Sequence, residues 1–258
     1  MRFHHEIAID PARCIGCGRC VDDCPAANLV VADGKAAPLT QGCIMCAHCV
    51  AVCPTNAVTI SGFDEEPRPL DGEQALEPAR LLAALGARRS MRRFADGPVP
   101  DEALADIVEA GRLTPTGGNA QDVSFIVLRE RLERCEELAV RLFRRVLPFA
   151  RLVDATARRT AIDDRFFFKG APAVVVVVAK DQVNGALAAS NMELVAQAHG
   201  LGVLYSGFFA MAARLSPALR RELGLARGQK VVTALVVGHP AVNYRRTAPK
   251  EPADVRFL

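Results

Sequence analysis

The sequence of 258 residues contains no tryptophan and two tyrosines, and aromatic residues make up 5% of it. Proteins that bind single-stranded nucleic acids stack the bases on aromatic side chains. No nucleic-acid recognition motif is present either, so we expect no nucleic-acid partner. Long apolar runs are also missing. The longest, at 171–179, has nine residues, whereas a transmembrane helix needs about 20, and we therefore expect no membrane span.

Signals for export and for dinucleotide binding are absent as well. The N-terminus does not resemble a signal peptide, so we expect a reducing, cytoplasmic location. No G-x-G-x-x-G segment follows a strand pattern, and no G-x-x-x-x-G-K-[ST] segment occurs, so the chain shows no dinucleotide-binding fold of its own. Hydrophobic residues make up 50% of the sequence and charged residues 24%, which is typical of a globular protein.

Cysteine, in contrast, is abundant and unevenly distributed. Eight of the nine cysteines lie between positions 14 and 53, in two copies of C-x2-C-x2-C-x3-C-P. In this motif the first three cysteines bind one iron–sulfur cluster and the fourth binds the other. The spacing predicts two [4Fe–4S] clusters, one held by Cys14, Cys17, Cys20 and Cys53 and the other by Cys43, Cys46, Cys49 and Cys24.

Disulfides and zinc are the other common roles of clustered cysteines. A reducing location argues against disulfides. A structural zinc site needs two C-x2-C pairs, so it would leave the remaining cysteines of the motifs and the Cys-Pro pairs without a role. The stretch resembles the bacterial two-cluster ferredoxins, and its repeat of 29 residues, from Cys14 to Cys43, implies the two pseudo-symmetric halves of that family. The ninth cysteine, Cys135, is expected to be only a small core residue.

A change in composition predicts two domains. Residues 61–77 contain glycine, proline and acidic residues without apolar periodicity, which is typical of a linker. We therefore expect a ferredoxin-like domain at 1–63, a linker at 64–77 and a second domain at 78–258. Residues 1–66 carry four basic and eight acidic side chains, a net charge of −4, whereas the remainder carries a net charge of +7. The basic part could attract the acidic part or bind an anionic cofactor.

Apolar periodicity in the second domain predicts both helices and strands. A strand buried on both faces is expected at Ala173–Ala179, where valines follow one another without alternation. Three consecutive phenylalanines, Phe166–Phe168, are expected to pack in the core rather than to form a lid. The other expected strands are Phe125–Leu128 and Lys230–Val237, and the expected helices are Pro78–Ala87, Asp101–Gly111, Glu130–Arg151 broken at Pro148, Ala186–Gly200 and Ser216–Leu223.

Two segments of this domain have residues suited to a ligand. Four arginines and a serine follow the first helix, in Arg-Arg-Ser-Met-Arg-Arg-Phe at 88–94. Arginine forks match phosphate oxygens, although a solvated basic face would explain the same charge. The second segment, Thr114–Gln121, is rich in small residues that let backbone N–H groups approach a ligand, and Asn119 and Gln121 add side-chain amides.

From about Pro78 to its end the chain resembles the nitroreductase family of FMN enzymes. The resemblance rests on the segment 88–94, on Pro-Thr-Gly-Gly-Asn-Ala-Gln at 115–121, and on Gly-Leu-Gly-Val-Leu-Tyr-Ser-Gly-Phe, Gly-His-Pro and a basic tail further on. The resemblance implies an α+β fold, an intertwined homodimer and FMN at the subunit interface. Together with the cysteine motifs, it identifies the chain as similar to ferredoxin-nitroreductase proteins.

The resemblance also implies which residues contact FMN. Arg88, Arg89, Ser90 and Arg92 would hold its phosphate, ribityl and pyrimidine end. Ser206 and Gly207 would lie beside the flavin N5, and Arg246 or Lys250 would complete the phosphate site. Four residues would reach FMN from the partner subunit, namely Pro115, Thr116, Gly117 and Asn119. No catalytic acid or base is predicted, and His199, His239 and Tyr205 are given no role.

These features favour an oxidoreductase that converts between one-electron and two-electron transfer. In the preferred hypothesis a low-potential donor such as reduced ferredoxin transfers electrons to the clusters, and the clusters reduce FMN. The reduced FMN then reduces a nitro group, a quinone or an activated C=C bond. In the alternative, NAD(P)H reduces FMN and the clusters export electrons to a partner protein. A non-catalytic electron-transfer subunit is the third hypothesis.

Overall fold

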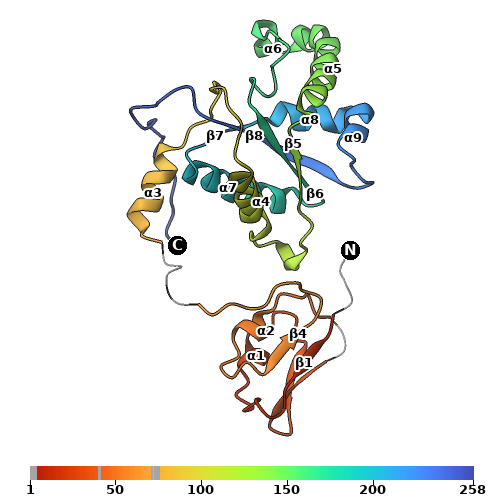
Figure 1. The fold of residues 1–258 in the computed structure, drawn as a ribbon, viewed down its shortest axis with the longest axis vertical. Helices are drawn as coiled ribbons and strands as arrows, with labels where there is room; N and C mark the ends of the chain where they lie inside the picture. The colour runs from red at the N-terminus through yellow and green to blue at the C-terminus, as the bar shows by residue number, and fades with distance from the viewer. Residues whose placement is uncertain (1–4, 40–41, 71, 73–75) are drawn as a thin grey trace. The chain divides into compact units, whose positions relative to one another are not determined.

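The computed structural model describes residues 5–39, 42–70, 72 and 76–258. The chain forms two compact units (Figure 1). The first contains the described residues up to 72 together with Gly117–Ala120, and the second contains Leu76–Thr116 and Gln121–Leu258. The domain limits 1–63, 64–77 and 78–258 stay a prediction, and positions 71 and 73–75 of the expected linker lie outside the described residues. In the described part of the chain no helix is both long and apolar enough to span a membrane.

The first unit contains two antiparallel strand pairs and two short helices. Strand β1 (Ile7–Ile9) pairs with β4 (Val58–Ile60), and β2 (Leu29–Ala32) pairs with β3 (Lys35–Pro38) through a turn at Asp33 and Gly34. Helices α1 (Arg19–Asp22) and α2 (His48–Ala51) each contain the third cysteine of a motif. Short strands expected from the sequence at residues 1–10, 29–31 and 57–60 overlap β1, β2 and β4, whereas β3 was not expected. Residues 1–4 lie outside the described part of the chain.

The 29-residue sequence repeat is also a structural repeat. Helix α2 begins and ends 29 residues after α1. Each helix follows a residue with a left-handed backbone, Gly18 at φ 76° and Ala47 at φ 57°. Gly16 and Met45, at φ 67° and 57°, correspond in the same way. Similar backbone at equivalent positions shows that both halves wrap their cysteines by the same path.

The second unit is built on a four-stranded antiparallel sheet with the order β5-β6-β8-β7. These strands are β5 (Ser124–Leu128), β6 (Ala173–Ala179), β7 (Gly202–Tyr205) and β8 (Lys230–Gly238). All seven residues of β6 are buried, which confirms the predicted central strand. Its side chains alternate between two cores, because successive residues of a strand point to opposite faces.

Helices cover both faces of this sheet (Figure 1). On one face α4 (Asp101–Arg112) and α7 (Gln182–Ala198) pack against Ala173, Val175 and Val177. On the other face α5 (Leu132–Val153), α8 (Gly207–Leu215) and α9 (Pro217–Glu222) pack against Val174, Val176 and Val178. Two further helices are α3 (Pro78–Ala87) and α6 (Ala155–Arg159). The α+β class predicted from the sequence is confirmed.

The expected break at Pro148 does not occur, since α5 continues from Leu132 to Val153. A proline inside a helix removes one backbone hydrogen bond to the carbonyl four residues earlier, here that of Arg144. Both Pro148 and Arg144 are exposed, so water can satisfy that carbonyl. Cys135, in the first turn of α5, is fully buried in the core, and burial raises the pKa of its thiol to about 11, in keeping with its predicted packing role.

The phenylalanine run packs in the core, as predicted. Phe167 and Phe168 are almost completely buried, with Phe167 edge-on to Phe143 and Phe168 next to Phe209. The buried carboxylate of Glu136 holds this run in place. It accepts hydrogen bonds from the main-chain N–H groups of Phe167 and Phe168 at 2.9 and 2.8 Å.

Glu136 makes stability depend on pH. Burial raises its pKa in the folded chain, whereas an unfolded chain keeps a value of about 4.3. The folded state therefore binds the proton more tightly, and stability should fall as pH rises from the unfolded to the folded pKa. A Glu136→Gln variant can still accept both N–H groups and should lose this slope. Denaturation midpoints measured across that pH window test the expectation, and an unchanged slope in the variant would contradict it.

Candidate functional site

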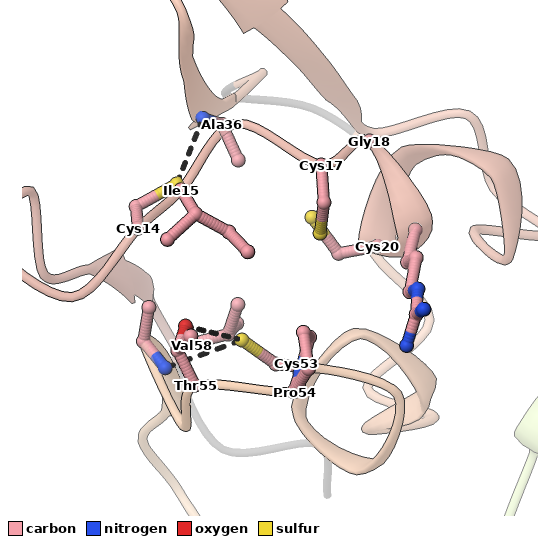
Figure 2. A pocket seen from close by; sticks show the side chains of 12 residues that line it. Cys14, Ile15, Cys17, Gly18, Cys20, Ala36, Cys53, Pro54, Thr55 and Val58 are labelled. Atoms are coloured by element: carbon pink, nitrogen blue, oxygen red, sulfur yellow. Dashed lines mark hydrogen bonds between the residues drawn. The ribbon is translucent and has the colours of Figure 1, made fainter.

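Four cysteines from both sequence motifs surround one cavity in the first unit (Figure 2). Cys14, Cys17 and Cys20 come from the first motif, and Cys53 comes from the end of the second. Ile15, Arg19, Ala36, Thr55 and Val58 also line the cavity. This is the set of cysteines that the spacing predicts for one cluster. The structure thus brings together residues separated by up to 39 positions in the chain.

The second predicted set is also brought together. The pKa of Cys49 is raised to about 11, mainly by burial. The nearby thiolates of Cys46, Cys43 and Cys24 also raise it. Correspondingly, Cys20 has a pKa raised by burial and is influenced by Cys53, Cys17 and Cys14. The fourth cysteine of each motif therefore lies with the first three of the other motif.

Main-chain N–H groups point at the cysteine sulfur atoms. Ala36 N donates to Cys14 Sγ at 3.4 Å, and Ala57 N donates to Cys53 Sγ at 3.2 Å. Around the other set, Asn28 N donates to Cys24 Sγ at 3.3 Å and Met45 N to Cys43 Sγ at 3.4 Å. Hydrogen bonds to sulfur stabilise the thiolate that a metal cluster requires.

The pKa values of two of these thiols reflect those donors. The Ala36 N–H lowers the pKa of Cys14. Burial alone would raise the pKa of Cys53, but N–H groups of Ala57 and Thr55 and the Thr55 hydroxyl bring it below its usual value. Four cysteines surround the cavity, and N–H groups donate to two of their sulfur atoms. This arrangement fits an iron–sulfur cluster, whose thiolate ligands are hydrogen-bonded.

In the second unit, the arginine-rich segment lies in an extended conformation between two neighbours. Met91 N donates to Val203 O at 2.8 Å, and Ser90 bridges Val203 in parallel, so the segment follows the β7 edge. On its other side Ala95 N donates to His239 O at 2.8 Å, and Phe94 bridges Pro240. The buried side chain of Met91 anchors the segment, while Arg92 and Arg93 are exposed.

Arg88 has a partner that the sequence did not reveal. Its Nη1 donates to Glu193 Oε2, and the Glu193 side chain on α7 is only 5% exposed. Tyr205 completes this group. Burial and the Glu193 carboxylate raise the Tyr205 pKa, and its hydroxyl donates to Ala189 O at 3.0 Å. Arg88 therefore has a structural role in addition to any contact with a ligand.

Ser206 and Gly207 lie at the end of β7, three and four residues after Val203. Ser206 is buried and its N–H donates to Ala234 O at 2.8 Å, while Gly207 begins α8. The space beside the Gly207 Cα is open. The arginine-rich segment therefore runs along β7, and the Ser206–Gly207 pair directly follows the end of the same strand.

The basic tail approaches the same region. The Arg89 guanidinium lies 5.5 Å from the centre of the Tyr244 ring, and the Thr247 side chain lies beside Gly86 of α3. Figure 1 shows the tail passing along α3. Arg246 falls between Tyr244 and Thr247 and is exposed, as is Lys250. The contacts of Tyr244 and Thr247 thus bring this part of the tail beside Arg89 and α3, and the phosphate contact predicted for Arg246 or Lys250 stays a prediction.

The loop predicted to reach FMN from a partner subunit is divided between the units. Pro115 and Thr116 belong to the second unit, whereas Gly117 and Asn119 are grouped with the first. The Thr116 hydroxyl accepts a hydrogen bond from Gln121 N at 2.9 Å, and Asn119 has a left-handed backbone at φ 49°. The role predicted for this loop concerns a second copy and stays a prediction.

Three residues that the sequence analysis left without a role have local partners. His199 Nε2 lies 2.8 Å from Asp106 Oδ2, and His239 Nε2 lies 3.0 Å from Pro98 O. Tyr205 belongs to the group formed by Arg88 and Glu193. Each side chain therefore has a structural partner, and the expectation that none of the three takes part in the chemistry stays a prediction.

Similar proteins are known for a large part of this chain. A protein of Archaeoglobus fulgidus named "Putative NADH dehydrogenase/NAD(P)H nitroreductase" is 27% identical over 171 residues, covering 62% of this chain and 84% of its own. The structure of a BluB-like flavoprotein from Clostridium difficile 630 has a TM-score of 0.59 at 21% identity, with 71% of this chain and 100% of that chain covered.

A second solved structure is more similar in sequence. It is described as a "putative nitroreductase in complex with fmn" from Desulfovibrio desulfuricans, and it is 28% identical with a TM-score of 0.50, covering 69% of this chain and 94% of that chain. Residues 6–58 match the 4Fe-4S dicluster domain, and residues 85–239 match the nitroreductase family. The chain thus belongs to the nitroreductase family of oxidoreductases and carries a 4Fe–4S dicluster ferredoxin domain before its nitroreductase domain.

Proposed function

We propose that this protein is an FMN-dependent oxidoreductase in which a low-potential donor, such as reduced ferredoxin, supplies single electrons through two [4Fe–4S] clusters to FMN for the reduction of a small organic acceptor. The observation that carries the proposal is the union of a dicluster domain and a nitroreductase domain in one chain. The bound flavin would supply the conversion between single electrons and a two-electron hydride equivalent. Acceptor classes that suit this chemistry are nitro groups, quinones and activated C=C bonds.

The cysteines would hold the clusters in the crossed arrangement, with Cys14, Cys17, Cys20 and Cys53 on one and Cys43, Cys46, Cys49 and Cys24 on the other. The shared cavity of the first set and the N–H donors on Cys14, Cys24, Cys43 and Cys53 support this assignment. The proposed ferredoxin-like domain spans 1–63, followed by a linker at 64–77 and the FMN domain at 78–258.

The FMN-binding residues would come from the segment beside β7 and from the tail. Arg89, Ser90 and Arg92 would bind the phosphate, ribityl and pyrimidine end, with Arg246 or Lys250 completing the phosphate site. Arg88 uses one guanidinium N–H for Glu193, and since arginine has five N–H donors, others remain for FMN. The open space at Gly207 supports a flavin edge beside the Ser206–Gly207 backbone, where the Gly207 N–H would orient N5, because the Ser206 N–H already donates to Ala234 O.

The protein would act as a homodimer, with Pro115, Thr116, Gly117 and Asn119 contacting the partner's FMN. Apolar side chains left exposed in the second unit support this, because exposed apolar patches mark interaction surfaces. Helix α3 buries none of its residues although it carries Leu81, Leu82 and Leu85. Phe208, Met211 and Leu215 on α8 are exposed as well.

A second candidate reverses the electron flow. NAD(P)H would reduce FMN, and the clusters would pass the electrons to a partner protein. The observation that favours it is the printed name of the Archaeoglobus fulgidus relative, "Putative NADH dehydrogenase/NAD(P)H nitroreductase", which refers to nicotinamide donors.

The two candidates differ in which donor bleaches the flavin. Purified protein with its clusters and FMN would be incubated anaerobically with reduced ferredoxin, NADH or NADPH, while flavin and cluster absorbance are followed separately. The preferred function requires flavin reduction by ferredoxin and oxidation of the reduced flavin by a nitroaromatic or a quinone. Flavin that stays oxidised while the clusters are reduced would overturn it. Rapid bleaching by NADH or NADPH alone would favour the reverse flow.

A further inference from the structure

The two halves of the first unit are equivalent in backbone but not in the charges and hydroxyl groups around their cysteines. The 29-residue repeat aligns Cys24 with Cys53, and each sulfur accepts an N–H from the residue four positions later, Asn28 at 3.3 Å and Ala57 at 3.2 Å. This pair of backbone donors is therefore matched between the two cysteines. The side chains around the two sites, in contrast, are not matched.

The first difference is a hydroxyl group. Thr55 Oγ1 lies 3.7 Å from Cys53 Sγ, as Figure 2 shows. A sulfur atom that ligates iron carries no proton, so in the loaded protein the hydroxyl must be the donor. The repeat places Ala26 at the equivalent position beside Cys24. Cys53 therefore has a donor that Cys24 cannot have.

The second difference is in positive charge. The ammonium group of Lys35 donates to Cys14 O and acts on the charge of the Cys14 thiolate. Glu6, of opposite charge, is the residue 29 positions earlier. Arg19 lines the cavity of the Cys14 set, and its equivalent, His48, is engaged with the Asp23 carboxylate at 3.3 Å.

The third difference is in negative charge. Asp23 directly precedes Cys24 and lies against His48 of the second motif, whereas the apolar Val52 directly precedes Cys53. Asp23 is exposed, so its influence is screened by solvent in part but has the same sign as the other two differences. These three differences put a donor or a positive charge on the side of Cys14 and Cys53.

Reduction adds one electron to a cluster and makes it more negative by one charge. Donors and positive charges close to the sulfur atoms stabilise that form more than the oxidised form, and hydrogen bonds to sulfur raise the reduction potential. We infer that the cluster held by Cys14, Cys17, Cys20 and Cys53 has the higher reduction potential of the two, and that the Thr55 hydroxyl, Lys35 and Arg19 raise it. This inference rests on the proposed presence of both clusters.

Matched substitutions in the two halves provide the test. An anaerobic redox titration of the full chain, loaded with clusters and FMN, would follow each reduced cluster by its electron paramagnetic resonance signal. Thr55→Ala should lower the ratio of reduced to oxidised cluster about fivefold at a fixed potential, and only for the cluster of higher potential. Thr55→Ser should stay within about twofold of the native ratio, because it keeps the hydroxyl.

The reciprocal variant is Ala26→Thr, which adds a hydroxyl beside Cys24 and should raise the potential of the other cluster only. The inference is overturned if Thr55→Ala shifts the cluster of lower potential, or shifts neither. Its failure can be told apart from failure of the proposed function. Two cluster signals with an unreduced flavin would contradict the electron path, whereas a shift at the wrong cluster would contradict only the ordering.

Discussion

Replacing Cys53 by alanine is expected to halve the iron content of the protein, from about eight to about four atoms per chain. Cys53 belongs to the second motif in sequence but lies around one cavity with Cys14, Cys17 and Cys20. Its loss should therefore remove the cluster of the first motif and leave the other intact. Iron and acid-labile sulfide analysis, together with electron paramagnetic resonance of the reduced protein, measures this.

Comparison with two further variants makes the crossing itself testable. Cys53→Ala and Cys14→Ala should lose the same resonance signal, whereas Cys43→Ala should lose the other. Cys135→Ala is the control, because this cysteine is buried in the core of the second unit and should keep both signals. If Cys53→Ala and Cys43→Ala lost the same signal, each motif would bind its own cluster and the crossed assignment would be wrong.

Replacing Arg88 by methionine is expected to destabilise the folded protein by about 2 kcal/mol. The substitution leaves the Glu193 carboxylate, 5% exposed, without its cationic partner, and breaking a buried ion pair in this way costs about 3–5 kcal/mol. The Arg88 side chain is 39% exposed, so solvent screens the pair and reduces the effect. Urea unfolding of flavin-free protein measures the change without a contribution from lost cofactor binding.

Two controls separate the ion pair from a general effect of losing an arginine. Arg93→Met removes an exposed arginine of the same segment and should change the free energy of unfolding by about 0.5 kcal/mol or less. Combining Arg88→Met with Glu193→Gln should recover part of the loss, since no unpaired carboxylate remains. Equal stabilities of Arg88→Met and Arg93→Met would show that the pair contributes nothing.

The sequence was most informative where spacing alone sets the geometry. The C-x2-C-x2-C-x3-C-P repeat predicted which four cysteines meet at the cavity, because a short backbone path leaves few alternatives. The buried strand at Ala173–Ala179 was equally clear, since an unbroken valine run suits a strand with helices on both faces. Helix α3 began and ended as predicted, with Pro78 in its first turn and Glu77 accepting from Ala79 N and Arg80 N.

Contacts between distant segments could not be predicted from the sequence. Arg88 and Glu193 are 105 positions apart, and only the fold places α7 beside the arginine-rich segment. Strand β7 and helix α8 were missed as elements because they have only four and nine residues, and such short segments contain too few repeats of a period to identify it. The asymmetry between Thr55 and Ala26 was visible in the sequence but gained meaning only from the distance to Cys53 Sγ.

Flavin reduction in a rapid-mixing experiment tests the central claim most directly, namely that electrons pass from the clusters to FMN within this protein. Oxidised protein would be mixed anaerobically with reduced ferredoxin, and cluster and flavin absorbance would be recorded with time. We expect the clusters to be reduced first and the flavin to follow, and we expect Cys53→Ala to slow the flavin phase while its FMN content stays unchanged. Flavin reduction at the native rate in that variant would contradict the account.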